Sequence, residues 1–220
     1  MLDLTVSGLL LDMDGTLVDS TALVEALWTE FAARHGLDLA RILSISHGRP
    51  SLDTVRDMLP DAEPEEQQRE RDRIEAAGLL RTDGIVEVPG AAAFLHRVET
   101  LELPVAIVTS APRDLAAVRF DAAGVPLPEL AVTADDITAG KPDPQPFVLG
   151  AQLLGIRPGA CAAFEDSAAG LAAARTAGAA AVVVGDYEGP ETVGVPRIRD
   201  WRGVAIERTE EGFRIREDAG

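Results

Sequence analysis

Two aspartates, Asp12 and Asp14, stand two residues apart directly after the apolar run Gly8–Leu11. In a β-strand, residues two apart point to the same face, and Gly15 can turn the chain sharply where the strand ends. Two carboxylates presented together suit a metal-assisted reaction at phosphorus, in which one attacks the phosphorus atom and the other moves a proton. Because an Asp-x-Asp pair also fits an ordinary turn at a strand end, the rest of the chain must supply a cation for the phosphate and further carboxylates for a metal.

Further sets of polar residues follow short apolar segments along the chain. They are Thr109 with Ser110, Lys141 in the loop after a short segment, and Glu165 with Asp166. In open parallel sheets, ligands bind beyond the carboxyl ends of the strands, so we expect these residues to meet the two aspartates at one edge. Each set also has a structural alternative: a helix cap for the Thr-Ser pair, an ordinary loop position for the lysine, and a favourable helix N-terminus for the acidic pair.

These residues supply what phosphoryl transfer needs, because positioned cations and hydrogen-bond donors provide most of its catalysis. We expect Asp12 to attack the phosphorus and form an aspartyl-phosphate intermediate. Asp14 would protonate the leaving alcohol and then activate water. Thr109 and the Ser110 amide would hold phosphate oxygens. Lys141, the only lysine in the chain, would neutralise the nucleophile and the phosphate together.

The same set contains the oxygen donors of a magnesium site, because Mg²⁺ is hard and usually takes only a few ligands from protein. We expect Asp12, the backbone carbonyl of Asp14, and Asp166 to bind Mg²⁺, with Glu165 bound directly or through water. The ion would also screen the carboxylate nucleophile from the phosphate that it attacks.

The composition limits the classes of protein to which the chain can belong. Its 220 residues, 46% of them hydrophobic, can hold one large domain or one domain with a smaller insertion. We expect no membrane span, because no apolar run reaches ~18–20 residues, and no signal peptide, because no basic segment precedes the first apolar run. A net charge of −17 argues against nucleic acid and anionic membranes as partners. The single cysteine, Cys161, fits a reducing cytoplasm. We therefore expect a cytoplasmic protein, monomeric or weakly dimeric, that acts on a small phosphorylated metabolite.

Strand and helix patterns alternate through most of the chain, and the strands are short and continuously apolar. This alternation predicts an α/β fold with a parallel sheet covered on both faces. The first strand is expected over roughly residues 6–12. Residues 1–18 and 87–220 are predicted to form the core, while residues 19–86 have a helical pattern and are predicted to form an inserted cap. The C-terminal tail has no clear assignment beyond a hairpin pattern around a Glu-Gly turn.

Four short motifs stand in order at the predicted strand ends: Asp12–Ser20, Val108–Ser110, Gly140–Pro144 and Glu165–Ser167. They resemble the four motifs of the haloacid dehalogenase-like hydrolase superfamily, over about residues 6–186. Within that superfamily the chain is similar to the beta-phosphoglucomutase-like branch, which has a small helical cap after the first motif. The resemblance implies a Rossmann-like core, Mg²⁺ and an aspartyl-phosphate mechanism. It also implies that Asp12 is the nucleophile, that Asp14 is the acid and base, and that Lys141 neutralises the phosphate.

The resemblance also excludes several activities that are found in the superfamily. Dehalogenases of the superfamily lack the second acid, which is present here as Asp14. Phosphonatase-type members need a cap lysine for a Schiff base, and the P-type ATPases have a lysine after the nucleophile and much longer chains; neither feature is found in this sequence. A phosphatase or a phosphomutase therefore remains.

The resemblance implies that His47, Gly48 and Arg49 of the cap face the active site and select the leaving group. The guanidinium of Arg49 suits phosphate or sugar hydroxyls, and His47 could bond a hydroxyl; alternatively, both are surface residues near a helix end. Mutases resembling this branch typically have a lysine as well as an arginine here, and this cap has no lysine. We therefore favour hydrolysis of small sugar or polyol phosphates. The alternatives are a beta-phosphoglucomutase-type mutase and, less favoured, a non-catalytic protein that binds phosphorylated metabolites.

Overall fold

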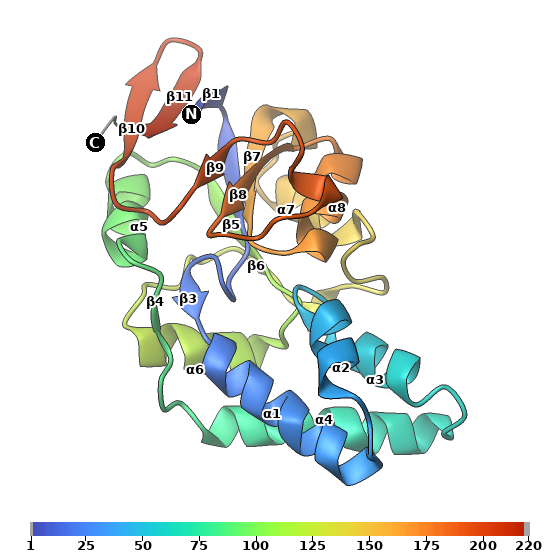
Figure 1. Cartoon of the computed structure of the whole chain (residues 1–220). Helices are drawn as coiled ribbons and strands as arrows, with labels where there is room; N and C mark the ends of the chain where they lie inside the picture. Colours follow the sequence, from blue (N-terminus) through green and yellow to red (C-terminus); the bar gives the residue numbers. More distant parts are fainter. Residues whose placement is uncertain (1, 218–220) are drawn as a thin grey trace.

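The computed structural model describes residues 2–217. Its central strands are β2 (Gly8–Leu11), β5 (Val105–Val108), β6 (Ala131–Val132), β7 (Cys161–Glu165), β8 (Ala180–Val184) and β9 (Arg197–Ile198). They form one parallel sheet in the order β6-β5-β2-β7-β8-β9 (Figure 1). The inner strands β2 and β7 are buried throughout, as expected for a parallel sheet covered on both faces. The predicted α/β fold is confirmed.

Helices cover both faces of this sheet. They are α5 (Ala91–Thr100), α6 (Arg113–Ala123), α7 (Gln145–Leu153) and α8 (Ala168–Ala177), with single turns of 3₁₀ helix at Ala134–Asp136, Pro158–Ala160 and Pro190–Thr192. Leu10 and Ala163 share an apolar cluster with residues of α7 and α8. Their strand neighbours Leu11 and Phe164 belong to a second cluster, with residues of α5 and α6. Successive strand residues thus face opposite layers, which is why the strands read as continuously apolar.

Strand β2 lies between β5 and β7, where the order of the strands reverses, and α/β sheets bind ligands at such a switch point. The three strands are level with one another, because Leu11 is paired with both Ile107 and Phe164. The next residue along each strand therefore stands in one row at the carboxyl edge of the sheet. These residues are Asp12, Val108 and Glu165.

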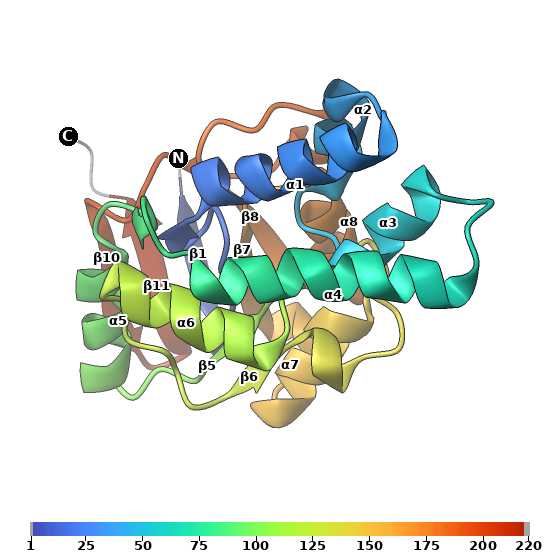
Figure 2. The same cartoon turned by 90° about the horizontal axis from the view of Figure 1, so that it is seen from below.

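The remaining helices lie together beyond this edge of the sheet (Figures 1 and 2). They are α1 (Thr21–His35), α2 (Leu39–Ser46), α3 (Ser51–Met58) and α4 (Pro64–Leu80). The chain enters them through β3 (Val18–Asp19) and returns through β4 (Val86–Glu87), which pair antiparallel. The division into a core and a cap of residues 19–86 remains our proposal. No helix within residues 2–217 has the length and apolarity needed to cross a membrane.

The first predicted strand, residues 6–12, is divided in the structure. The segment before Ser7 is β1 (Asp3–Val6), which pairs with β11 (Gly212–Glu217), and β11 pairs in turn with β10 (Val204–Thr209) in a separate antiparallel sheet. At the break, the Ser7 amide donates to the Ala160 carbonyl at 2.7 Å. Strands β10 and β11 therefore form the predicted C-terminal hairpin, and β11 also pairs with the N-terminal strand β1. The residues before Ser7 alternate between polar and apolar, whereas Gly8–Leu11 are all buried, so the change of pattern at Ser7 coincides with the change of sheet.

Glu70 on α4 joins two helices of the cap, and its side chain is only 9% exposed. Its Oε2 accepts from Arg34 at 2.9 Å, and Arg73 donates to Oε1 at 2.9 Å. Burial alone would raise the pKa of Glu70, but hydrogen bonds from Arg34 and His35 bring it below its ordinary value of 4.5. Its stabilising contribution is therefore complete above about pH 4.5 and is lost as the pH falls through the lower pKa of the folded state.

We expect Glu70→Gln to lower the free energy of unfolding at pH 7 by about 1–3 kcal/mol, with the difference from wild type shrinking below pH 4.5. Urea unfolding at pH 7 and at pH 4 measures both values. Glu30→Gln is the control, because Glu30 forms an exposed ion pair with Arg81, and such pairs contribute little. A loss of the same size at both pH values would contradict the predicted role of the Glu70 charge.

Candidate active site

A tight turn presents both aspartates of the first motif at the end of β2. The Met13 carbonyl accepts from the amides of Leu17 and Val18 at 2.8 and 3.0 Å, which curls the backbone over the strand end. Gly15 has a φ of 79°, and a Cβ there would lie 1.9 Å from Oδ2 of Asp166. The turn thus requires glycine for its conformation and for the close approach of the fourth motif.

Lys141 occupies the row at the carboxyl edge of the sheet and is 1% exposed. Its Nζ donates to Asp12 Oδ1 at 2.6 Å, to Glu165 Oε1 at 2.6 Å and to the Val108 carbonyl at 2.8 Å. These acceptors come from three adjacent strands, so the level register of the sheet satisfies all three ammonium donors at once. Burial alone would lower the pKa of Lys141, but the carboxylates of Asp12 and Glu165 raise it. The lysine therefore stays charged beside the predicted nucleophile.

Asp12, Glu165 and Asp166 each place a carboxylate oxygen within 4.8 Å of the others. Burial, together with the charge of Glu165, raises the pKa of Asp12 to about 8, although Lys141 opposes the change. The pKa of Asp166 is also raised, first by burial and then by Glu165 and Asp12. One lysine does not balance these carboxylates. A divalent cation would do so, and an all-oxygen donor set is the kind that Mg²⁺ prefers.

The two acids of the fourth motif have different surroundings. Both oxygens of Glu165 accept hydrogen bonds: Oε1 from Lys141, and Oε2 from the Asp166 amide, the Ser167 amide and the Ser167 hydroxyl at 3.0–3.2 Å. Within residues 2–217, the carboxylate of Asp166 accepts no hydrogen bond, although burial and neighbouring charge act on it. Asp166 is therefore the more available ligand, and Glu165 holds the lysine. Ser167 also caps α8, where its hydroxyl accepts from the Gly170 amide at 3.1 Å.

Thr109 and Ser110 follow β5 and line a pocket together with the two aspartates of the first motif. Neither residue caps α6, because the N-cap of that helix is Pro112 and has no side-chain hydrogen bond. The Thr109 hydroxyl accepts from the Ala111 amide at 3.1 Å, whereas the Ser110 hydroxyl donates to the Gly48 carbonyl of the cap at 2.9 Å. The second motif thus contacts the cap directly.

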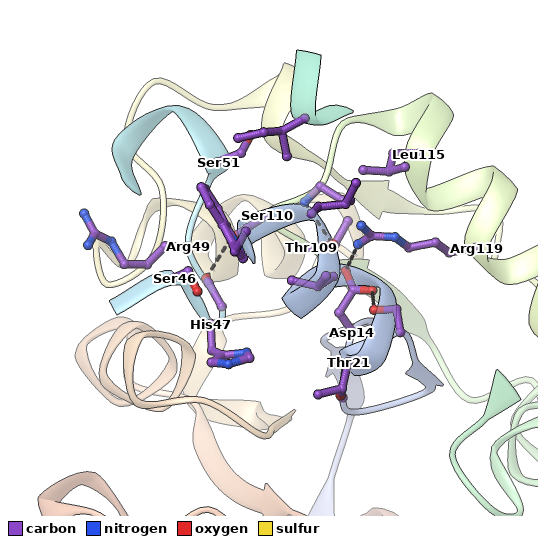
Figure 3. Close-up of a pocket in the computed structure, with 18 of the residues that line it drawn as sticks. Asp14, Thr21, Ser46, His47, Arg49, Ser51, Thr109, Ser110, Leu115 and Arg119 are labelled. Atoms are coloured by element: carbon purple, nitrogen blue, oxygen red, sulfur yellow. Dashed lines mark hydrogen bonds and ion pairs between the residues drawn. The ribbon is translucent and has the colours of Figure 1, made fainter. Parts of the chain in front are cut away.

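The three cap residues predicted to bind substrate line the same pocket, but they are held differently (Figure 3). Gly48 has a φ of 73°, and a Cβ there would meet the Ser167 hydroxyl at 2.0 Å, so the cap loop lies directly on the core. The Arg49 side chain points away from Asp14 and forms an ion pair with Asp57 at 2.8 Å. His47 is exposed.

Arg119 on α6 is a residue of this pocket that sequence reasoning missed. It is 6% exposed, and its guanidinium donates to Asp14 Oδ2 at 2.6 Å (Figure 3). The Ser20 hydroxyl donates to the other oxygen, Oδ1, at 2.5 Å. The signal that could have revealed Arg119 is its position four residues after Leu115, on the buried face of a helix that follows the second motif. Together, Arg119 and Ser20 orient the Asp14 carboxylate.

One pocket therefore joins the carboxyl edge of the sheet to the cap. Its floor contains Asp12, Asp14, Thr109, Ser110 and Asp166, and its other walls come from α1, α4, α6 and the segment from the end of α2 to the start of α3. Such an arrangement places two aspartates, hydroxyl and amide donors and an acidic cluster of the metal-binding type around one small pocket.

Comparison with known proteins agrees with this geometry. Residues 6–178 match the family model of the haloacid dehalogenase-like hydrolases. The chain is 39% identical to hexitol phosphatase A of Escherichia coli (strain K12) over 177 residues, which cover 80% of this chain and 82% of the relative. It is 32% identical to a beta-phosphoglucomutase of Mycobacterium bovis over 214 residues, with 82% and 80% of the two chains covered.

A solved structure of a hydrolase from Pseudomonas syringae superimposes with a TM-score of 0.77 at 25% identity, and covers 87% of this chain and 91% of that one. The family match spans more than half of the chain and includes all the motifs that line the pocket floor. The resemblance noted from the sequence is thus confirmed, and the chain belongs to the haloacid dehalogenase-like hydrolases.

Proposed function

We propose that the protein is a Mg²⁺-dependent phosphatase that hydrolyses monophosphate esters of small sugars or polyols through an aspartyl-phosphate intermediate. The observation that carries this proposal is the Asp12 carboxylate at the pocket floor, bonded to a fully buried Lys141 at 2.6 Å and placed beside a second acid, Asp14. The similarity to a hexitol phosphatase supports hydrolysis of a polyol phosphate.

The acidic cluster supports the choice of cofactor. Asp12, Asp166 and the backbone carbonyl of Asp14 would hold Mg²⁺, with Glu165 acting directly, through water, or through its bond to Lys141. When bound, the ion supplies positive charge that screens the nucleophile from the phosphate oxygens.

The residues of the pocket account for both halves of the reaction. Asp12 attacks the phosphorus, and the bond from phosphorus to the leaving oxygen breaks as Asp14 gives that oxygen a proton. Asp14 then takes a proton from water, which attacks the aspartyl phosphate and releases inorganic phosphate with Asp12 restored. Thr109 and the Ser110 amide hold the non-bridging oxygens, and Lys141 neutralises the charge that develops.

A phosphomutase is the second candidate, because of the 32% identity to a beta-phosphoglucomutase. A mutase must bind a second phosphate on its intermediate, and this requires a cation in the cap. The arginines that line the pocket already have carboxylate partners: Arg49 is paired with Asp57, and Arg119 with Asp14. The charges on the pocket wall therefore favour transfer of the phosphoryl group to water over transfer to a second phosphorylated sugar.

The decisive experiment measures phosphate release from a panel of sugar and polyol phosphates with Mg²⁺. We expect release from polyol monophosphates, and we expect excess EDTA to abolish it and added Mg²⁺ to restore it. β-Glucose 1-phosphate with a bisphosphate primer tests the mutase: glucose 6-phosphate formed without free phosphate would overturn the hydrolase. An absence of release from every ester would support the non-catalytic binding protein instead.

A further inference from the structure

The cap contributes a carboxylate to the pocket that the reaction above does not use. Glu75 lies on α4, lines the pocket, and has a side chain only 15% exposed. Its Oε1 accepts from the Ser51 hydroxyl at 2.5 Å, and its Oε2 accepts from Arg71 at 2.7 Å. Ser51, the first residue of α3, lines the pocket too. A carboxylate and a hydroxyl from two cap helices are thus joined at the pocket wall.

The Glu75 carboxylate keeps spare hydrogen-bond acceptors at the pocket wall, although it is paired with Arg71. Arg71 does not line the pocket, and it shares its charge with Asp72, whose carboxylate lies 3.2 Å from its Nε. A carboxylate has about four lone-pair sites, and Ser51 and Arg71 occupy only part of the capacity of Glu75. The oxygens of Glu75 can therefore accept further hydrogen bonds from hydroxyl groups of a ligand.

Two other residues that line the pocket carry buried polar atoms. Ser46 Oγ and Arg119 Nε are buried and have no hydrogen-bond partner within residues 2–217. Both residues are more than nine-tenths buried. An unsatisfied buried polar group costs free energy, but these two atoms have almost no exposed surface, so the subsite rests on the oxygens of Glu75 and the Ser51 hydroxyl.

A second phosphate would meet the opposite situation. It would bring negative charge toward Glu75 in a partly desolvated pocket, where repulsion between like charges is strong. The pocket arginines cannot compensate without leaving Asp57 and Asp14 unpaired. The acceptors of Glu75 therefore suit neutral hydroxyls better than a second phosphate.

We propose that Glu75, held by Ser51, forms a hydroxyl-binding subsite in the cap that selects monophosphates of neutral polyols over bisphosphates. This inference rests on the proposed phosphatase function and identifies the part of the pocket that determines which leaving group is accepted. Glu75 acts here as a specificity residue, because it contacts the hydroxyls of the leaving group and takes no part in the transfer of phosphorus.

The test compares kcat/KM for three esters in wild type, Glu75→Gln and Ser51→Ala. The esters are a hexitol 6-phosphate, phenyl phosphate, which has no leaving-group hydroxyls to bind, and glucose 1,6-bisphosphate. Glu75→Gln should lower kcat/KM for the hexitol ester by about 10–100-fold, because a hydrogen bond to a charged acceptor is replaced by one to a neutral amide. It should change kcat/KM for phenyl phosphate by less than about 3-fold. It should also raise kcat/KM for the bisphosphate relative to that for the hexitol ester. Ser51→Ala should produce a smaller change of the same kind.

Glu66→Gln is the matched control, because Glu66 is an exposed carboxylate on the same helix, α4. An equal fall for the hexitol ester and phenyl phosphate in Glu75→Gln would overturn the subsite, since it would indicate general damage to the cap. So would unchanged rates for all three esters. If the wild type hydrolyses none of the three, the panel of sugar and polyol phosphates decides the phosphatase proposal. Calorimetric binding of the hexitol ester then tests the subsite separately, and equal affinity of wild type and Glu75→Gln overturns it.

Discussion

Asp12→Asn should lower the rate of phosphate release by at least about 10⁴-fold, since removing a nucleophile that acts in concert with its partners typically costs this much or more. An amide oxygen can still accept from Lys141, so the contact at Oδ1, 2.6 Å long in the wild type, can persist. The substitution also removes one of the carboxylates crowded around the lysine. The folded state should therefore survive while the chemistry fails.

Three measurements separate loss of chemistry from loss of structure in this variant. Phosphate release gives the rate, urea unfolding gives the stability, and mass spectrometry after a rapid acid quench detects the phosphoryl group on the wild-type protein during turnover. Asp19→Asn is the companion variant, because Asp19 is an exposed acid within the same motif. Phosphorylated protein in Asp12→Asn, or turnover at the wild-type rate, would refute Asp12 as the nucleophile.

Lys141→Met should abolish turnover and also lower the free energy of unfolding by about 3–5 kcal/mol, the usual cost of breaking a buried ion pair from one side. Its ammonium, with no exposed side-chain surface, forms ion pairs with Asp12 and Glu165 and donates to the Val108 carbonyl. Without the ammonium, the buried carboxylates of Asp12 and Glu165 would lie close together at the edge of the sheet with no cation between them. The loss should be larger than for any exposed charge in the protein.

The double variant Lys141→Met with Glu165→Gln tests this account of the stability. Removing the fully buried Glu165 charge should restore part of the lost unfolding free energy, because one uncompensated carboxylate is neutralised. Activity should remain absent, since the cation at the phosphate is still missing. A double variant no more stable than Lys141→Met would show that packing of the lysine stem, rather than charge balance, is what the site needs.

The order of polar residues at strand ends was sufficient to predict which side chains the fold brings together. Asp12, Thr109, Lys141 and Glu165 meet because the parallel strands end in one row, and this rule depends only on strand direction. The contacts of the cap loop could not be predicted in this way. Whether Arg49 faces a ligand or Asp57 depends on how α2 and α3 pack, and no period in the sequence encodes that geometry.

Arg119 and the break at Ser7 illustrate the same limit in two other forms. Arg119 reaches Asp14 across 105 residues of sequence, so the contact depends on tertiary packing even though its helix is easily predicted. At Ser7 the chain changes sheets: β1 pairs with the C-terminal β11 and β2 with β5, and these partners come from distant segments of the sequence. Local patterns predict elements and their burial, whereas partners that come from distant segments require the folded chain.

The burial of Lys141 gives the protein an internal reporter of its own unfolding. It is the only lysine in the sequence, and its side chain has no exposed surface in the folded state. Reagents that acylate lysine ε-amines can reach it only when the strand ends separate, and the bonded ammonium is a poor nucleophile until they do. The rate of labelling at this one position therefore measures how often the catalytic edge of the sheet opens.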